Sequence, residues 1–81
     1  MNDPDNTLFT TFDIYLSSVL VTLGFPVDSL DQSNRQKVEF SFQREAGLDE
    51  AIQRYWSKQL ALEPQALFGN HKFLKNRIYS A

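Results

Sequence analysis

The stretch TTFDIYLSSVLVTLG, residues 10–24, decides the fold of this chain. Its apolar residues recur with the spacing of a helix, at Phe12, Leu16, Val19, Leu20 and Leu23. Three more widen the stripe around the helix: Ile14, Tyr15 and Val21. A helix that is apolar on nearly every side is typical of the centre of a domain or of a contact with a partner subunit. Residues 10–13 offer capping groups at its start, and Gly24 favours a left-handed end.

A β-hairpin is predicted to follow this helix. Residues 25–30 alternate weakly between apolar and polar, and Pro26 favours an edge position because proline cannot donate to a strand ladder. Residues 31–34, Asp-Gln-Ser-Asn, have the composition of a turn. Beyond them Val38, Phe40 and Phe42 alternate with polar residues, which predicts a strand with one buried face and one face in water.

Two further helices complete the predicted order. Asp49 and Glu50 suit the first turn of a second helix, and Pro64 suits the first position of a third. The predicted inner face of the last helix carries Leu67, Phe68, Leu74 and Ile78. Residues 60–62, Leu-Ala-Leu, fit either the end of the second helix or a short third strand. We therefore expect a flexible tail over residues 1–9 and a single α+β domain over residues 10–81, with one helix, an antiparallel β-hairpin and two helices packed on one small core.

The order of these motifs resembles a known family. The run Thr11-x-Asp13-x-Tyr15-Leu16-Ser17-Ser18-x-Leu20, then Gly24-Phe25, then Val38-x-Phe40-x-Phe42, resembles a small uncharacterised bacterial and archaeal family, a domain of unknown function. A Tyr-Trp pair, here Tyr55-Trp56, and a closing helix are similar too, the helix through Pro64, Leu67, Phe68, Leu74, Lys75, Ile78 and Tyr79. The resemblance covers residues 10–80, supports the predicted order of elements and implies no activity.

Composition excludes several classes of protein. The 81 residues include no cysteine, which excludes a disulfide scaffold, thiol catalysis and a Cys-bound zinc site. With one histidine, a metal would have to rely on carboxylates, so neither a metal nor another cofactor is expected. The start of the chain is acidic, and the longest apolar run is far shorter than the roughly 20 residues of a membrane span. We expect a cytoplasmic protein without membrane contact.

Catalytic groups are sparse. His71 is the one side chain that titrates near neutral pH without special tuning, and no nucleophile motif accompanies it. The three glycines lie too far apart in the sequence to form a phosphate-binding loop. We therefore expect no catalytic residues and a protein that is not an enzyme. A pocket that gathers His71 with a carboxylate would revive the enzyme hypothesis.

Two sets of residues are candidates for binding. Lys72, Lys75 and Arg77 on the last helix, extended by Arg35 and Lys37, can contact nucleic-acid phosphates, or they can form a solvated face that complements the helix dipole. Four apolar residues lie off the main stripes and are candidates for a protein interface, unless the core uses them all: Ile14, Val21, Trp56 and Phe73.

The leading hypothesis is a non-enzymatic protein-interaction or adaptor module that associates with itself or with a larger assembly. Its small size and the family resemblance suggest an accessory or inhibitor protein of a phage or mobile element. A nucleic-acid-binding accessory domain that uses the basic last helix is the alternative.

Overall fold

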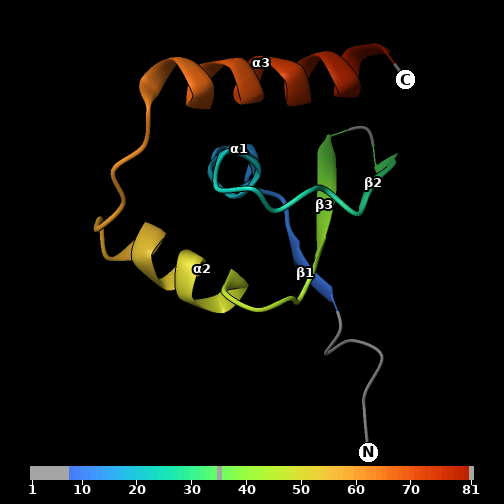
Figure 1. Ribbon diagram of the computed structural model, residues 1–81. Coiled ribbons are helices and arrows are strands. Elements are labelled where there is room, and N and C mark those ends of the chain that lie inside the picture. The colour runs from blue at the N-terminus through green and yellow to red at the C-terminus, as the bar shows by residue number, and fades with distance from the viewer. Residues whose placement is uncertain (1–7, 35, 81) are drawn as a thin grey trace, which may run out of the picture.

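The computed structural model describes residues 8–34 and 36–80 and shows an α+β protein, as predicted. Its elements are β1 (Leu8–Thr11), α1 (Ile14–Thr22), β2 (Ser29–Asn34), β3 (Lys37–Gln43), α2 (Leu48–Trp56) and α3 (Pro64–Ser80) (Figure 1). The predicted order of helix, hairpin and two helices is confirmed, and a strand precedes it.

That first strand is the main addition to the predicted fold. β1 pairs antiparallel with β3, so the three strands lie in the order β1-β3-β2 with β3 in the middle. Phe9 lies opposite Phe42 in this ladder and is partly buried against the core. Leu8 and Phe9, which the sequence places in the N-terminal tail, therefore belong to the sheet. Residues 1–7 of the predicted tail lie outside the described residues.

The helix α1 lies at the centre of the molecule, as its apolar pattern predicts. Residues 16–20 are five consecutive buried residues, and five residues span more than one helical turn, so the middle of the helix is buried around its whole circumference. Figure 1 shows α1 end-on, between α3 and α2, with the sheet beside it. Two buried hydroxyls donate hydrogen bonds to backbone carbonyls of the preceding turn. The Ser17 hydroxyl donates to the carbonyl of Asp13 at 2.9 Å, and the Ser18 hydroxyl donates to that of Ile14 at 2.7 Å.

The helix α1 begins at Ile14, two residues after Phe12, where the predicted helical face begins. Asp13 is the N-cap, and its Oδ1 accepts hydrogen bonds from the backbone amides of Tyr15 at 2.8 Å and Leu16 at 3.2 Å. Phe12 precedes this cap and is exposed, so its assignment to the inner face of the helix is wrong.

The end of α1 is a glycine stop, as predicted. Gly24 has φ +104°, its amide donates to the carbonyl of Val21, and the next amide, of Phe25, donates to the carbonyl of Leu20. This pair of bonds satisfies two carbonyls that the helix end leaves without partners, and it needs a residue that tolerates positive φ.

The hairpin forms with its first strand displaced along the chain. β2 begins at Ser29 and includes residues 31–34, whose composition predicts a turn, while residues 25–28 form no strand. The carboxylate of Asp31 and the side-chain carbonyl of Asn34 accept hydrogen bonds from the amides two residues on, those of Ser33 and Gln36, at 2.9 Å each. The turn-forming chemistry is thus used within a strand whose register is irregular between Asp31 and Asn34.

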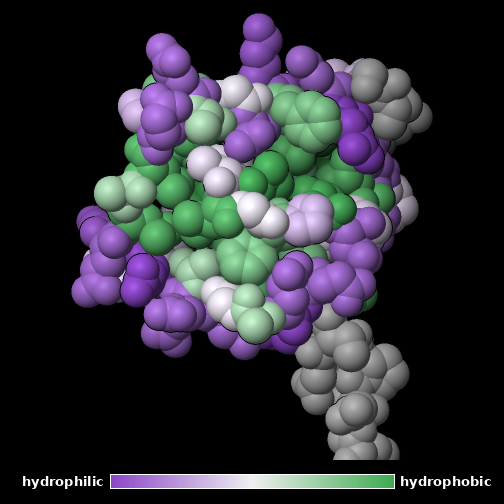
Figure 2. Space-filling view, in the orientation of Figure 1, coloured by the Kyte–Doolittle hydropathy of each residue, from purple (hydrophilic) through white to green (hydrophobic). Residues whose placement is uncertain are grey.

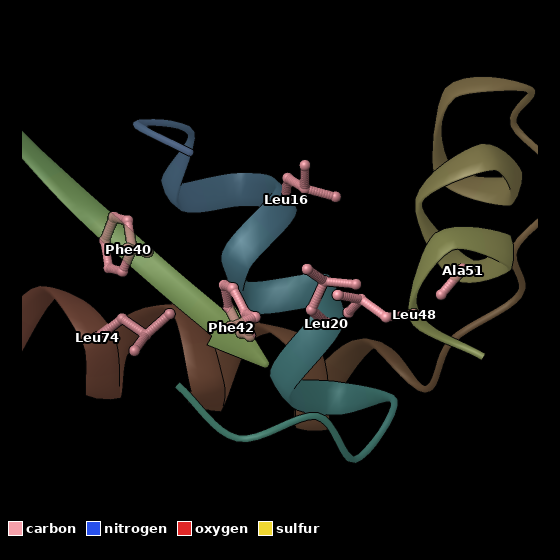
Figure 3. Packing of buried hydrophobic residues seen from close by; sticks show 7 residues of the cluster. All are labelled: Leu16, Leu20, Phe40, Phe42, Leu48, Ala51 and Leu74. Carbon is pink, nitrogen blue, oxygen red and sulfur yellow. The ribbon is translucent and has the colours of Figure 1, made fainter. Parts of the chain in front are cut away.

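The core joins the helices to one face of β3. Figure 3 shows Phe40 and Leu74 of α3 at one end of this cluster, Phe42 and Leu20 in the middle, and Leu48 and Ala51 toward the other end. The opposite face of β3 is less wet than predicted, because Ser41 is buried between Thr10 of β1 and Ser29 of β2 in the ladder.

The last two helices begin where the sequence predicts. Pro64 opens α3, and the carboxylate of Glu63 accepts bonds from the amides of Gln65 at 3.2 Å and Ala66 at 2.7 Å. Residues 60–62 form neither helix nor strand and belong to the connection between α2 and α3. Phe68 does not face the core as predicted, because it lies roughly 100° around the helix from Leu67 and is exposed.

Candidate functional site

A groove opens between α2 and α3, with α1 as its floor. Its first hollow, of about 310 Å³, is lined by Tyr15, Ser18, Val19, Tyr55, Leu67, Phe68 and His71. A second hollow of about 270 Å³ shares Val19, Tyr55 and Leu67 with it and continues along the connection between α2 and α3. The second is also lined by Lys58, Leu60, Leu62 and Pro64. We call the two hollows together the helix groove.

The helix groove results from the way α3 crosses α1. Near the C-terminal end of α1, the Asn70 amide donates to the hydroxyl of Thr22 at 2.9 Å. Near the opposite end of α1, the His71 ring lies against Tyr15. Because neighbouring residues of α3 contact the two ends of α1, the helices cross at a steep angle, as Figure 1 shows. The space on the Tyr15 side of this crossing is left between α3 and α2.

The walls of the first hollow are largely aromatic. The Tyr15 and His71 rings are stacked, with centroids 5.2 Å apart and planes 8° from parallel. Burial raises the pKa of the Tyr55 phenol, and the negative charge of Asp13 raises it further, so this side chain stays a neutral hydrogen-bond donor well above neutral pH. The Ser18 hydroxyl in the floor is already bonded to the backbone of its own helix.

The groove does not join His71 to an acid. Of the described residues that line the two hollows, none is an aspartate or a glutamate. The described residues also include no group of three or more His, Asp or Glu side chains placed to hold a metal ion. Within the same part of the chain, no helix combines the length and the apolar character that a membrane crossing requires.

The amino-acid sequence matches the model of a known protein family. The sequence model of a family described as a domain of unknown function, DUF5659, covers residues 6–80. The chain belongs to the DUF5659 family. The resemblance to an uncharacterised small-domain family is thus confirmed. Searches of curated proteins and of solved structures returned no match.

The four interface candidates predicted for this DUF5659 domain fall into two groups. Ile14 and Val21 are half-buried and pack against the core, whereas Trp56 and Phe73 are exposed. The Trp56 ring meets Tyr55 edge to face, with centroids 5.0 Å apart, so Trp56 lies beside the groove although it does not line it. Phe73 lies roughly 140° around α3 from Phe68, on the other side of that helix.

Sequence reasoning missed most of the groove's own residues. The spacing of apolar residues assigns Tyr15 to the stripe of the first helix and Phe68 to the inner face of the last helix, and it gives Tyr55 no role beyond the Tyr-Trp pair. A usable signal was present at Phe68. At roughly 100° per residue, Leu67, Leu74 and Ile78 lie within about 40° of one another around the helix, whereas Phe68 lies about 80° or more from all three.

Apolar surface of the DUF5659 domain is not confined to the groove. Figure 2 shows apolar residues gathered between α3 and α2 on the face seen in Figure 1, with hydrophilic residues around them. A separate hollow beyond the end of α1 is lined by Leu23, Phe25 and Leu60. Two charged side chains, Glu50 and Arg54, also line that hollow, and they form an ion pair at 3.4 Å.

The predicted nucleic-acid residues do not form one strip. Lys72, Lys75 and Arg77 are exposed, but at roughly 100° per residue Lys75 lies about 60° from Lys72 and about 160° from Arg77. Lys37 lies elsewhere, with its ammonium 5.4 Å from the centroid of the Phe12 ring, in a hollow that Asp31 and Glu39 also line. Arg35 lies outside the described residues.

Proposed function

We propose that this DUF5659 domain is a protein-interaction module that binds its partner in the helix groove. The observation that carries the proposal is a concave apolar surface with exposed aromatic side chains in its lining and beside it. Tyr15 is 65% exposed, Phe68 is 68% exposed and Trp56 is 64% exposed. Single exposed apolar residues are ordinary on a protein surface, but a group of them around a hollow is typical of an interaction site.

The energetics support the same proposal. Covering apolar surface contributes roughly 25 cal/mol per Å², and aromatic side chains bury the largest areas. Tyrosine and tryptophan are also enriched among the residues that dominate binding energy at interfaces. The first hollow therefore offers a partner several anchoring points close together, at little cost in desolvated charge, because no Asp, Glu, Lys or Arg lines it.

The test is site-specific photocrosslinking in cells of the native host. A photoreactive phenylalanine analogue replaces Phe68 at the groove, or Phe73 on the other side of α3 as the matched control. We expect crosslinking to a discrete protein from position 68 and little from position 73. Equal crosslinking from both positions, or none from position 68, would contradict binding in the groove.

Self-association is one form of this proposal, and light scattering on the purified chain separates it from binding to a different protein. A dimer that dissociates on Phe68→Asp and persists on Phe73→Asp would identify the partner as a second copy. A monomer that still crosslinks from position 68 would identify a different protein.

A second candidate function is nucleic-acid binding by α3, favoured by the exposed pair Lys72 and Lys75 on adjacent turns. Phosphate contacts make binding strongly dependent on salt. We expect such binding to fall with rising salt and with Lys72→Glu or Lys75→Glu, and to fall less with Arg77→Glu. An affinity for nucleic acid that does not depend on Lys72 and Lys75 would contradict this candidate.

A further inference from the structure

We infer that the groove receives an amphipathic helix of the partner with acidic residues beside its apolar stripe. The inference rests on the proposed function and specifies the chemistry of the partner. It is carried by the placement of three lysines at the two ends of the groove, Lys58, Lys72 and Lys75.

The lysines follow directly from the groove residues of α3. Residues four apart are neighbours on a helix surface, so Lys72 follows Phe68 and Lys75 follows His71 by one turn each. The groove thus runs along α3 into a pair of ammonium groups. At its other end, Lys58 lines the second hollow. A helix lying in the groove would have positive charge beside both of its ends.

These positive charges are not neutralised within the described part of the chain. The ion pairs among the described residues are Arg44 with Asp49 and Arg54 with Glu50, neither of which includes these lysines. The carboxylates of Asp13 and Glu63 lie near the groove and accept bonds from backbone amides at the starts of α1 and α3. They retain their negative charge, but the three lysines outnumber them. The potential along the rim therefore favours an acidic ligand.

The shape of the groove favours a helix over a compact ligand. The two hollows adjoin through Val19, Tyr55 and Leu67, and together they extend from the connection between α2 and α3 to His71. Apolar side chains one turn apart on a helix are separated by about 5–6 Å at their Cβ atoms, which suits two adjoining hollows. An amphipathic helix in an apolar groove is a recurrent mode of peptide recognition.

The test uses the purified chain and three labelled peptides of about four helical turns, measured by fluorescence anisotropy. All three carry the same leucine stripe, and the flanking residues are glutamate, glutamine or lysine. We expect the glutamate peptide to bind about tenfold more tightly than the glutamine peptide, given three exposed charges. This advantage should shrink above about 0.1 M salt, and the lysine peptide should bind most weakly.

Variants in matched pairs locate the site. Phe68→Asp should weaken binding of the glutamate peptide about tenfold or more, and Phe73→Asp should leave it nearly unchanged. Lys75→Glu should remove most of the preference for glutamate over glutamine, and Arg77→Glu should not. Circular dichroism of each variant verifies that the helices are retained. The four substituted residues are exposed, so the fold should tolerate each change.

The outcomes separate this inference from the proposed function. If the glutamine peptide binds as tightly as the glutamate peptide in a manner that depends on Phe68, the module stands and the acidic partner is wrong. If no peptide binds while position 68 crosslinks to a protein in cells, the inference is again overturned alone. Displacement of the glutamate peptide by an oligonucleotide of equal charge, or by a small apolar carboxylate, would overturn the protein partner itself.

Discussion

Asp13 links the start of the central helix to the groove. Its carboxylate accepts the amides of Tyr15 and Leu16, and its negative charge also acts on the phenol of Tyr55. One side chain therefore fixes the position of a groove wall and contributes to the electrostatics of another. Two predictions at the scale of the residue follow from its position.

Replacing Asp13 with alanine should lower the free energy of unfolding by about 1 kcal/mol, because two amides at the start of α1 lose their acceptor. Urea denaturation followed by circular dichroism measures the change. Asp13→Asn is the control, since asparagine caps helices about as well as aspartate and should retain most of the stability. A loss as large for asparagine as for alanine would show that the charge, and not the cap, matters.

Tyr55 should make the protein less stable in strong alkali. Its folded pKa is raised above the ordinary value of 10.0, so the unfolded chain loses the phenolic proton first. The stability contributed by the neutral phenol is present below pH 10.0 and is lost as the pH rises through the folded pKa. Denaturation midpoints of the wild type and Tyr55→Phe, compared across this range, should diverge, with the wild type falling more steeply. Parallel curves would contradict the prediction.

Single residues were the hardest level to predict. Phe12 and Phe68 fit helical spacing in the sequence, yet one precedes the cap and the other projects beside the groove. Spacing identifies which residues share a stripe, but the covered width of that stripe depends on what packs against it. No element packs over Phe68, because the space between α2 and α3 is partly open there.

At the scale of the element, two glycines differ in the backbone they serve. Gly24 has φ +104° at the end of α1, whereas Gly69 lies inside α3, and an added Cβ would meet no atom within 4 Å at either position. Crowding is thus absent at both, and only backbone conformation separates them. The pair provides an internal comparison of the two costs of glycine.

Gly24→Ala should destabilise the protein by more than about 1 kcal/mol, because alanine is strained at positive φ. Gly69→Ala should instead stabilise it by about 0.5–1 kcal/mol, since alanine is the better helix former. Thermal denaturation of the two variants measures both shifts. Shifts of the same sign would contradict this account of the end of α1.

Elements defined by local chemistry were predictable, and those defined by distant partners were not. The helix stop at Gly24 and the start at Pro64 depend on residues close in the sequence. β1 is only four residues long, and its partner β3 lies about thirty residues further on. β2 lies further along the chain than predicted, because Asp31 and Asn34, which favour turns, are accommodated at an irregular point of the ladder.

At the scale of the whole molecule, stability depends on a small core closed by α3. Domains of this length are stabilised by only about 4–12 kcal/mol, at about 0.05–0.15 kcal/mol per residue. Leu74 is 2% exposed, and it joins α3 to the phenylalanines of β3. Leu74→Ala should cost about 2–5 kcal/mol, enough to unfold much of the population at the lower end of that range.

Phe68→Ala is the control for Leu74→Ala, because Phe68 belongs to the same helix and is exposed. Its removal should change the stability by no more than about 0.5 kcal/mol. Chemical denaturation monitored by Trp56 fluorescence compares the two. If Phe68→Ala proved as destabilising as Leu74→Ala, Phe68 would be part of the core and the groove would lose its rim.

The groove itself was beyond reach of the sequence. The apolar surplus was visible, and exposure of Trp56 and Phe73 agrees with their place off the main stripes. Which surplus residues gather around one hollow depends on how steeply α3 crosses α1, and that angle is set by contacts such as Asn70 with Thr22. These two residues are far apart in the sequence, and neither carries a signal for the other.

The central position of α1 has a consequence for synthesis of the chain on the ribosome. The helix α1 packs against α3 more than against any other element, and it is synthesised before α3. Until residues 64–80 have left the ribosome, the apolar side chains of α1 are not covered by α3. The domain therefore completes folding only after α3 has been translated. During that interval the nascent chain exposes apolar surface, and exposed apolar surface on a folding intermediate favours aggregation and binding by chaperones.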